Sequence, residues 1–182
     1  RSDLGNRPCW LAASTHPGEE EVIMDAHKHL KQIFPDLLTL IAPRHIHRRA
    51  DIQKIFHTHH YQCAIRSQGD KITSTTDFYL IDSMGELGTF FKLSPITFVA
   101  GSLLLGSKTL GGHNPLEPAL LNCAISFGPD MSNGRDSADG LLKRNAAVEV
   151  TNAQELAAFV QNCLQQPHMA QEMAEKARLY AE

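Results

Sequence analysis

The sequence predicts an α/β fold, a doubly wound, Rossmann-like domain built on a mostly parallel sheet. Short apolar runs alternate with amphipathic helical stretches along the 182 residues. Strands separated by helices need crossover connections, which are typical of parallel sheets covered by helices on both faces. With 42% hydrophobic side chains the chain can build one sizeable core, so we expect a single domain over residues 1–182.

The first half of the chain contains two units of strand and helix. Residues 9–13 form an apolar run that ends in a turn-forming segment, and residues 19–34 carry apolar side chains at helical spacing, with three glutamates in the first turn. Residues 37–42 predict a buried strand. A second amphipathic stretch with Ile52 and Phe56 follows, so the same unit occurs twice.

The rest of the chain continues this alternation of apolar and amphipathic stretches. The predicted elements are strands at residues 61–66, 78–81, 96–100, 124–127 and 147–150, a polar loop at 68–76, a short helix to Leu93, a helix of about ten residues ending near Asn145, and helices over 152–165 and after Pro167.

Four polar or glycine-containing loops follow predicted strands, at residues 14–18, 43–45, 82–87 and 101–114. The carboxyl ends of parallel strands meet at one edge of a sheet, and ligands of doubly wound domains collect there. We therefore expect a ligand site where these four loops converge.

The motif GGHNPLEP combines a two-glycine turn with a helix start. Gly111 and Gly112 can adopt positive φ and let a ligand approach the backbone. Asn114 is a favoured N-cap and Pro115 suits the first helical position, so we expect a helix with free N–H groups that attract an anion. Asn114 either contacts a ligand or caps the helix. Glu117 either accepts hydrogen bonds from a ribose or is a surface carboxylate stabilised by the helix dipole.

Two other loops carry candidate binding groups. Arg44 directly follows a predicted buried strand, where its guanidinium suits a bidentate contact with a phosphate or carboxylate; the alternative is a surface arginine. Met84 to Leu87 (MGEL) opens a short helix, so its N–H groups and an apolar side chain can hold a base edge. The alternative is a strand-to-helix turn with Met84 in the core.

Ten histidines raise the question of a metal site. His27 and His29 are two residues apart on a predicted helix and do not share a face, and no carboxylate or cysteine partner stands at ligand spacing. We therefore expect no metal. His16 and His113 differ because they lie in candidate ligand loops. The four cysteines form no CxxC, which argues against a zinc ribbon or a disulfide framework.

The composition excludes two classes of partner. A net charge of -3 argues against nucleic acid, because binding to a phosphate backbone needs a concentrated basic face. No run of about 18 to 20 apolar residues and no signal-peptide pattern is present, so we expect a soluble domain.

Six motifs occur in a fixed order along the chain: STHPGEEE from Ser14, PRH from Pro43, DSMGEL from Asp82, AGSLL from Ala100, GGHNPLEP from Gly111, and GP at Gly128. Together they resemble the carboxyl-terminal half of the 3-deoxy-D-manno-octulosonic acid (Kdo) transferases of lipopolysaccharide synthesis. The resemblance covers most of the chain, and GGHNPLEP with PRH is its most specific part.

The resemblance implies the C-terminal domain of a GT-B glycosyltransferase, in which two Rossmann-like domains face each other across a cleft. This domain would hold the donor CMP-Kdo, with no further cofactor. An N-terminal domain absent from this chain would bind the lipid A precursor and supply the general base and the membrane contact. The complete protein would act at the cytoplasmic face of the bacterial inner membrane, whereas the isolated chain would bind nucleotide without turnover.

The resemblance also implies roles for individual residues. Arg44 would contact the CMP phosphate and stabilise the leaving group. The other donor-binding residues would be Ser14, Thr15 and His16, which face the cleft, Met84, Gly85, Glu86 and Leu87 at the cytidine, and Gly111, Gly112, His113, Asn114 and Glu117 at the phosphate and ribose.

Two other functions stay open, a nucleotide-sugar 2-epimerase of the same fold and a non-catalytic nucleotide-binding module. The chain also departs from the usual pattern of the family. The loop at residues 101–111 is several residues longer, Gly134 stands where an aromatic residue commonly follows Asn133, and Asn122 replaces a glycine. Lys108 in the longer loop is either an added anion contact or a solvated charge.

Overall fold

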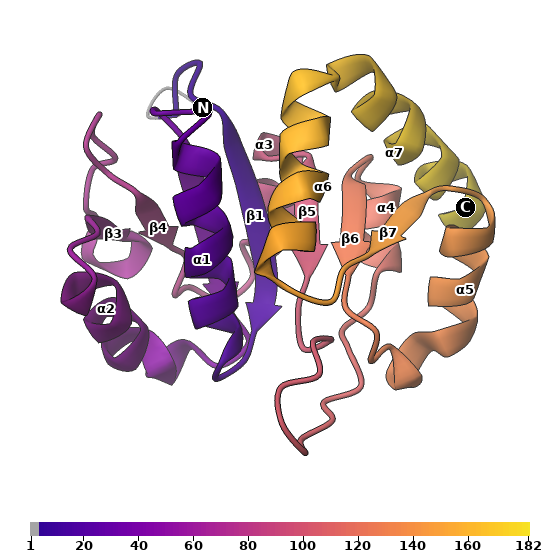
Figure 1. Ribbon diagram of the computed structural model, residues 1–182, viewed down its shortest axis with the longest axis horizontal. Helices are drawn as coiled ribbons and strands as arrows, with labels where there is room; N and C mark the ends of the chain where they lie inside the picture. Colours follow the sequence, from indigo (N-terminus) through magenta and orange to yellow (C-terminus); the bar gives the residue numbers. More distant parts are fainter. Residues whose placement is uncertain (1–3) are drawn as a thin grey trace.

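The sheet has seven parallel strands in the order β3-β4-β2-β1-β5-β6-β7 in the computed structural model, which describes residues 4–182 (Figure 1). The predicted doubly wound α/β fold is therefore confirmed. The strands are β1 (Cys9–Thr15), β2 (Leu38–Pro43), β3 (Cys63–Ile65), β4 (Phe78–Leu80), β5 (Ile96–Val99), β6 (Ala124–Phe127) and β7 (Ala147–Glu149).

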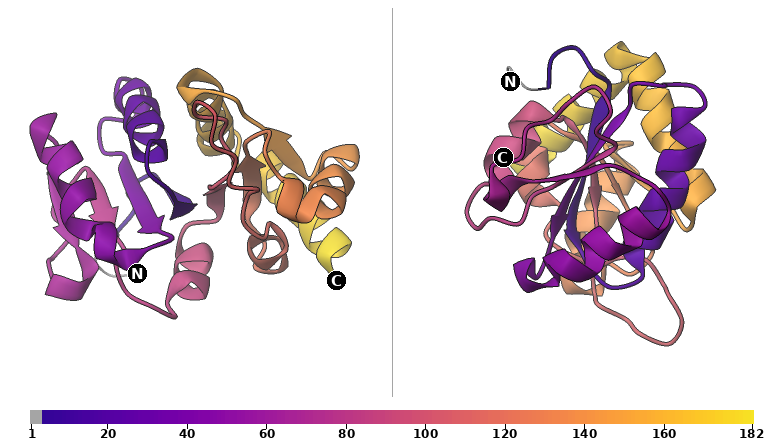
Figure 2. Two further views of the ribbon diagram at one scale, coloured as in Figure 1. Left: turned by 90° about the horizontal axis from the view of Figure 1, so that it is seen from below. Right: turned by 90° about the vertical axis from the view of Figure 1, so that its left-hand side faces the viewer.

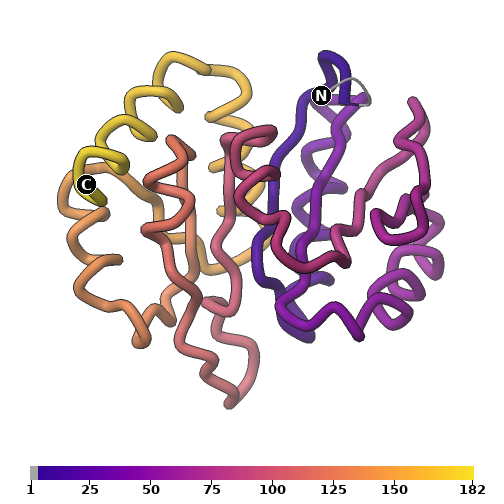
Figure 3. Tube along the Cα trace, turned by 180° about the vertical axis from the view of Figure 1, so that it is seen from behind, coloured from indigo at the N-terminus to yellow at the C-terminus, as the bar shows by residue number. Residues whose placement is uncertain are grey.

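Helices cover both faces of the sheet (Figures 1 and 3). One face packs against α1 (Glu19–Lys31), α2 (Arg49–Thr58) and α6 (Ala153–Gln165). The other face packs against α3 (Leu87–Leu93), α4 (Leu116–Leu120), α5 (Arg135–Lys143) and the end of α7 (Pro167–Ala181). Short 3-10 turns lie at Ile46–Arg48, Arg66–Gln68 and Ser132–Gly134.

The central strand shows why the sheet is buried on both sides. Successive side chains of β1 point to opposite faces, so Trp10 and Ala12 join one core while Leu11 and Ala13 join the other. All four are 2% exposed or less. Burial on both faces explains why the strand reads as a continuous apolar run rather than an alternating one.

The order of the strands places a switch point beside β1. The chain runs from β1 to β2, β3 and β4 on one side, and then returns to β5 on the other side of β1. In doubly wound sheets the crevice beyond this point is where ligands bind. The loop between β5 and α4 extends past the carboxyl ends of the strands there, at the bottom of Figure 1; the left view of Figure 2 looks onto this edge.

Most predicted boundaries agree with the structure within one or two residues, and the end of the first helix differs by three. The helix predicted at residues 19–34 ends at Lys31, because Pro35 disfavours helical geometry in the residue before it. The strand predicted at residues 61–66 is reduced to Cys63–Ile65, since Arg66 already starts a 3-10 turn that ends at Gly69 with a φ of 68°.

None of the helices between residues 4 and 182 combines the length and the apolar character that a membrane span requires.

Candidate functional site

Glu19 holds the loops after β1 and β5 together at the switch point. Its carboxylate is buried and accepts backbone N–H groups from His16 at 3.0 Å and Gly101 at 2.7 Å. Two longer bonds come from Ser102 at 3.3 Å and Leu103 at 3.4 Å. Burial raises the pKa of Glu19, and the four N–H donors oppose that rise. One carboxylate therefore fixes the backbone on both sides of the crevice.

Glu20 connects the loop after β1 to the loop after β2. Its Oε1 accepts a hydrogen bond from the Arg48 guanidinium at 2.6 Å and from the Thr15 hydroxyl at 3.3 Å. The Arg44 N–H donates to the Thr15 carbonyl at 3.0 Å, which ties the same two loops through the backbone. Because Thr15 is fully buried and its hydroxyl is used here, this predicted binding residue supports the loops from within.

Sequence reasoning missed the role of these two glutamates. It treated the three acidic residues at the start of α1 as partners of the helix dipole, whereas Glu19 and Glu20 are buried and only Glu21 is exposed. The signal in the sequence was their position directly after a strand-end turn, where a carboxylate can reach the N–H groups of the neighbouring loop.

His16 and His113 form a pair across the switch point. Their Nε2 atoms are 2.7 Å apart, and the rings are stacked with centroids 5.0 Å apart and planes 6° from parallel. His45 approaches His16 edge-on at 5.8 Å. A side chain at Gly101 would place its Cβ 2.7 Å from the His113 ring, and the φ of 71° there also favours glycine.

Both imidazoles of the pair are held in the neutral form. Burial, together with the positive charges of neighbours that include Arg44, lowers the pKa of His16 to about 4. Burial also lowers the pKa of His113, again with a contribution from Arg44. At neutral pH one Nε2–H therefore donates to the other Nε2.

Arg44 is the available cation beside this pair. Its side chain is exposed and makes no hydrogen bond or ion pair with another group of residues 4–182. Its backbone N–H is fixed on Thr15, so the start of the side chain is held at the carboxyl end of β2. An unpaired guanidinium at this position suits an anionic ligand.

Ser14 marks a bend at the end of β1. Its φ is 63°, and the register of the β1–β2 pair shifts between Ala13 and Thr15. Positive φ is uncommon for a residue with a Cβ, and such positions are frequent at ligand sites. The bend leaves Ser14 half-buried at the edge where His16 and Arg44 lie.

The two glycines of GGHNPLEP serve close packing of the protein itself. The Gly111 N–H donates to Asp130 Oδ2 at 2.7 Å, and the Gly112 N–H donates to the Gly101 carbonyl at 2.8 Å. Their φ values are 84° and 76°, and a Cβ on Gly112 would lie 2.9 Å from the Asp130 carbonyl oxygen. Both glycine N–H groups therefore have partners within the chain, while the predicted contact of this turn with a ligand stays a prediction.

Unpaired backbone donors occur at the next two residues. In the part of the chain that the structure describes, the backbone N–H groups of His113 and Asn114 have no hydrogen-bond acceptor. Both follow the turn that Asp130 and Asn133 fix, since the Asn133 side chain donates to the carbonyls of Leu110 and Gly112 at 3.1 and 3.2 Å.

The helix after this turn starts one residue later than predicted. Helix α4 begins at Leu116, and the Asn114 side-chain oxygen accepts the Leu116 N–H at 3.0 Å. Asn114 is therefore not the N-cap that was predicted: Pro115 occupies that position, and the Asn114 side chain closes an Asx turn just before the helix. Glu117 is exposed and its carboxylate has no partner among residues 4–182, so it is available to a ligand.

The MGEL segment is a turn that precedes α3 rather than the opening of the helix. Gly85 has a φ of 77°, and the helix begins at Leu87. Met84 is 79% exposed, which excludes its placement in the core. The Glu86 carboxylate pairs with Arg66 at 2.9 Å and also accepts a hydrogen bond from the Ser83 hydroxyl. Both contacts lower the pKa of Glu86, and the contact with Arg66 has the larger effect.

MGEL and GGHNPLEP lie on the same side of the sheet. Helices α3 and α4, which follow them, contact each other on the face seen in Figure 3. The loops after β2, β3 and β4 are joined by Asp82, which accepts the Ser67 N–H at 2.8 Å and contacts Arg49 at 3.3 Å. The predicted site residues thus line one edge, with the histidine pair and Arg44 at its switch point.

The departures from the family pattern have local explanations. Asn122 adopts a φ of 62°, a conformation that asparagine tolerates better than most residues in place of glycine. Lys108 lies in the exposed part of the long loop, where Leu105 and Lys108 form an antiparallel bridge. Its ammonium group makes no ion pair within residues 4–182, and nothing in the structure explains Gly134.

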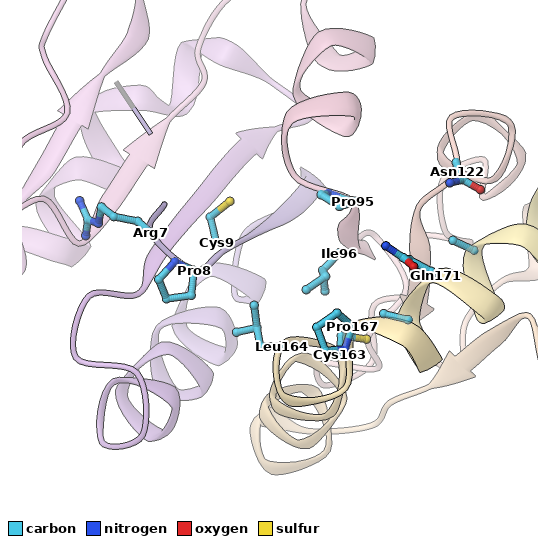
Figure 4. Close-up of a pocket in the computed structure, with 12 residues that line it drawn as sticks. Arg7, Pro8, Cys9, Pro95, Ile96, Asn122, Cys163, Leu164, Pro167 and Gln171 are labelled. Carbon is cyan, nitrogen blue, oxygen red and sulfur yellow. The ribbon is translucent and has the colours of Figure 1, made fainter. Parts of the chain in front are cut away.

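A hollow of about 360 Å3 lies at the opposite edge of the sheet (Figure 4). Its lining includes Cys9 and Ile96, the first residues of β1 and β5, together with Cys163 of α6 and Pro167 and Ala170 of α7. The amino ends of parallel strands are not where ligands of this fold collect. We therefore assign the functional site to the carboxyl edge.

Within residues 4–182, no three His, Cys, Asp or Glu side chains are arranged to hold a metal ion.

The doubly wound fold is that of the C-terminal domains of GT-B glycosyltransferases. Sucrose-phosphate synthase from Thermosynechococcus elongatus shares this fold, with a TM-score of 0.62 and 13% identity over 97% of this chain and 41% of that one. WaaG, a glycosyltransferase involved in lipopolysaccharide biosynthesis, has a TM-score of 0.61 and 12% identity over 99% of this chain and 44% of that one. At these identities the likeness concerns the fold alone.

A much stronger likeness identifies the family. The C-terminal CMP-Kdo binding domain of WaaA from Acinetobacter baumannii has a TM-score of 0.90 and 32% identity, over 98% of this chain and 91% of that domain. The chain belongs to the 3-deoxy-D-manno-octulosonic acid transferase family. No protein-family model matches it.

Relatives of the same name agree with this placement. The 3-deoxy-D-manno-octulosonic acid transferase of Rickettsia prowazekii is 40% identical over 153 residues, 84% of this chain and 32% of that protein. The enzyme of the same name from Haemophilus influenzae is 36% identical over 147 residues, 81% of this chain and 34% of that protein. The chain thus spans about a third of the length of these relatives.

Proposed function

We propose that this chain is the donor-binding half of a Kdo transferase, which moves Kdo from CMP-Kdo onto a lipid A precursor in lipopolysaccharide biosynthesis. The observation that carries the proposal is the 32% identity and TM-score of 0.90 with the CMP-Kdo binding domain of WaaA, over nearly the whole of both chains. The unpaired Arg44 at the switch point supports the same reading, because a nucleotide donor brings a phosphate to that edge.

Arg44 and two backbone donors stabilise the leaving group. When the bond between the sugar and CMP breaks, negative charge develops on the CMP phosphate. The Arg44 guanidinium and the free N–H groups of His113 and Asn114 bind that charge more strongly in the transition state than in the ground state. Glu19 and Asp130 keep the two loops in place, so little reorganisation is needed during the reaction.

The nucleoside lies between the MGEL turn and the start of α4. The exposed Met84 side chain offers an apolar contact to the cytosine ring, and the turn around Gly85 offers backbone groups to its edge. Glu117 is an unpaired carboxylate that accepts hydrogen bonds from the ribose hydroxyls. Glu86 acts through Arg66, with which it is paired, by fixing the turn.

The rest of the reaction belongs to a part of the protein outside this chain. An N-terminal half binds the lipid A precursor, supplies the general base that activates its hydroxyl, and contacts the cytoplasmic face of the inner membrane. This division is supported by the length of the relatives, about three times that of this chain. The isolated chain binds CMP-Kdo and does not turn it over.

No observation favours the epimerase as a second function. A putative UDP-N-acetylglucosamine 2-epimerase from Listeria monocytogenes has a TM-score of 0.63 and 12% identity over 98% of this chain and 42% of that one. That likeness concerns the fold alone.

The test uses the complete protein with CMP-Kdo and a lipid A precursor. Mass spectrometry of the lipid should show added Kdo, and analysis of the nucleotides should show released CMP. The isolated chain should give neither product. Transfer of another sugar, or epimerisation of a nucleotide sugar by the complete protein, would refute the proposal.

A further inference from the structure

We infer that His16 and His113 form the subsite for the carboxylate of the donor sugar, and that this subsite takes up one proton when the donor binds. The inference rests on the proposed function, because it needs an acidic sugar beside the CMP phosphate. It goes beyond that function because it names the residues that bind the sugar carboxylate and states that one proton is taken up on binding.

The geometry of the pair is that of two neutral imidazoles sharing one hydrogen. With the Nε2 atoms 2.7 Å apart, one ring donates its Nε2–H and the other accepts with a bare Nε2. If both Nε2 atoms carried hydrogens, the two N–H bonds would point at each other. The pair therefore changes its arrangement when it gains a proton.

The surroundings of the pair are rich in positive charge. Burial is the largest cause of the lowered pKa of His16, and the charges of Arg44, His45 and Arg48 in the loop after β2 add to it, with Arg48 itself paired with Glu20 at 2.6 Å. The start of α1 supplies Glu19, but its carboxylate is occupied by four backbone N–H groups. On the side of β6, Asp130 is engaged with Gly111 and Ser132. The nearby carboxylates are thus already hydrogen-bonded to other groups, and the histidine pair stays neutral when no ligand is bound.

A bound anion makes the protonated form of the pair more favourable than the neutral form. The guanidinium of Arg44 pairs with the phosphate, which removes most of its repulsion of the two rings, and the sugar carboxylate adds a negative charge beside them. The imidazole with the bare Nε2 then takes one proton from solvent. The two rings separate, and each donates its Nε2–H to the carboxylate. One proton is gained and no covalent bond changes.

The location of the pair explains why it recognises the sugar rather than the nucleotide. His16 follows β1 and His113 follows β5, so the pair lies at the switch point beside Arg44. The nucleoside contacts proposed above belong to the MGEL turn and α4 on one face of the sheet. The carboxylate of a 3-deoxy-octulosonic acid, which is attached next to the phosphate, is therefore the part of the donor that lies closest to the two histidines.

Calorimetry of this chain with CMP-Kdo tests the inference. The titration is repeated at pH 7.5 in buffers of different ionisation enthalpy, which gives the number of protons taken up. The phosphodiester of CMP-Kdo does not titrate near this pH, so the proton must come to the protein. CMP alone, measured at pH 8 where its phosphate is fully ionised, reports nucleotide binding without the sugar.

Three variants are compared in the same titration. His113→Gln and His16→Gln each keep a nitrogen donor close to the Nε2 position but cannot take up a proton. His168→Gln is the matched control, because His168 is exposed on α7 and makes no part of the site. Long-range proton–nitrogen NMR spectra of the wild-type histidine rings follow the two imidazoles directly, whether or not a variant folds.

We expect the wild type and His168→Gln to take up about one proton, with CMP-Kdo affinity rising about tenfold for each pH unit lowered between pH 8 and pH 7. Each pair variant should take up less than half a proton when it binds CMP-Kdo. The inference alone would be overturned if CMP binds but CMP-Kdo causes no proton uptake and leaves the imidazole spectra unchanged. Absence of binding by both ligands would overturn the proposed function and the inference with it.

Discussion

Arg44 is the single side chain on which the proposed chemistry depends most. It is exposed, has no partner within residues 4–182 and lies beside the histidine pair. In the complete enzyme, Arg44→Ala should raise the barrier by about 2 to 4 kcal/mol, the cost of removing one donor to a developing negative charge. This corresponds to a loss of roughly 30- to 900-fold in kcat/KM.

The control for Arg44 is Arg178→Ala, since Arg178 is a partly exposed arginine of α7 that pairs only with Glu182. Steady-state transfer assays of both variants, with CMP-Kdo varied, give the comparison. Turnover of Arg44→Ala equal to that of the control would remove Arg44 from the mechanism.

Glu19 contributes to the stability of the fold, whereas Arg44 contributes to the reaction. Glu19→Ala leaves buried N–H groups of His16, Gly101, Ser102 and Leu103 without an acceptor, so we expect the free energy of unfolding to fall by about 3 kcal/mol. Urea denaturation measures the change.

The matched control is Glu21→Ala, because Glu21 lies two residues further along the same helix but is exposed. Its effect should stay within about 0.5 kcal/mol. Equal destabilisation by the two substitutions would mean that helix propensity, and not the buried network, sets the effect of Glu19.

At the scale of residues, the sequence indicated where candidate groups lie but not which were free. Arg44 was assigned to an anion from its position after a strand, and the structure leaves its side chain unpaired. Glu19 and Thr15 are neighbours in the same motif, yet both are buried and used within the protein. Glu19 depends on residues 82 to 84 positions away, and the Thr15 hydroxyl depends on the buried carboxylate of Glu20; local sequence patterns contain neither contact.

At the scale of elements, the turn at Gly112 offers a sharp test. Gly112→Ala adds strain from a φ of 76° and a Cβ 2.9 Å from the Asp130 carbonyl oxygen. The strain alone costs about 1 kcal/mol and the clash with fixed backbone a further 1 to 3 kcal/mol. We expect a loss of stability of about 2 to 4 kcal/mol in urea denaturation and weaker binding of CMP.

Gly106→Ala isolates the strain from the clash. Gly106 has a φ of 72° in the exposed part of the long loop, and a Cβ there would have no neighbour within 4 Å. This variant should lose only about 1 kcal/mol and keep its affinity for CMP. Equal losses in the two variants would show that close packing against Asp130 contributes nothing.

The elements themselves were largely predictable, and their ends were not. Apolar runs and helical spacing located the seven strands and the main helices. The start of α4 was misplaced because Asn114 and Pro115 form a separate turn, with the Asn114 side chain bound to the Leu116 N–H. For MGEL the alternative of a strand-to-helix turn agrees with the structure, in which Gly85 has positive φ and α3 begins at Leu87, but the core position that this alternative gave Met84 is wrong. Such turns depend on tertiary contacts that a single glycine or proline does not specify.

At the scale of the whole molecule, the alternation of strands and helices was enough to predict that the loops converge at one edge. The order of the strands was not available from the pattern, because β3 and β4 exchange places relative to their sequence order. That order matters for function, since it puts β1 beside β5 and brings His16 against His113 across 97 residues of chain.

The central claim is that this edge binds a cytidine nucleotide for a Kdo transferase. Isothermal titration calorimetry of the chain with CMP, UMP and UDP tests it most directly, because the three ligands separate the base from the number of phosphates. We expect CMP to bind at least tenfold more tightly than UMP and UDP. Tighter binding of UDP, or no binding of any of the three, would contradict the assignment of this chain as the CMP-Kdo half of the enzyme.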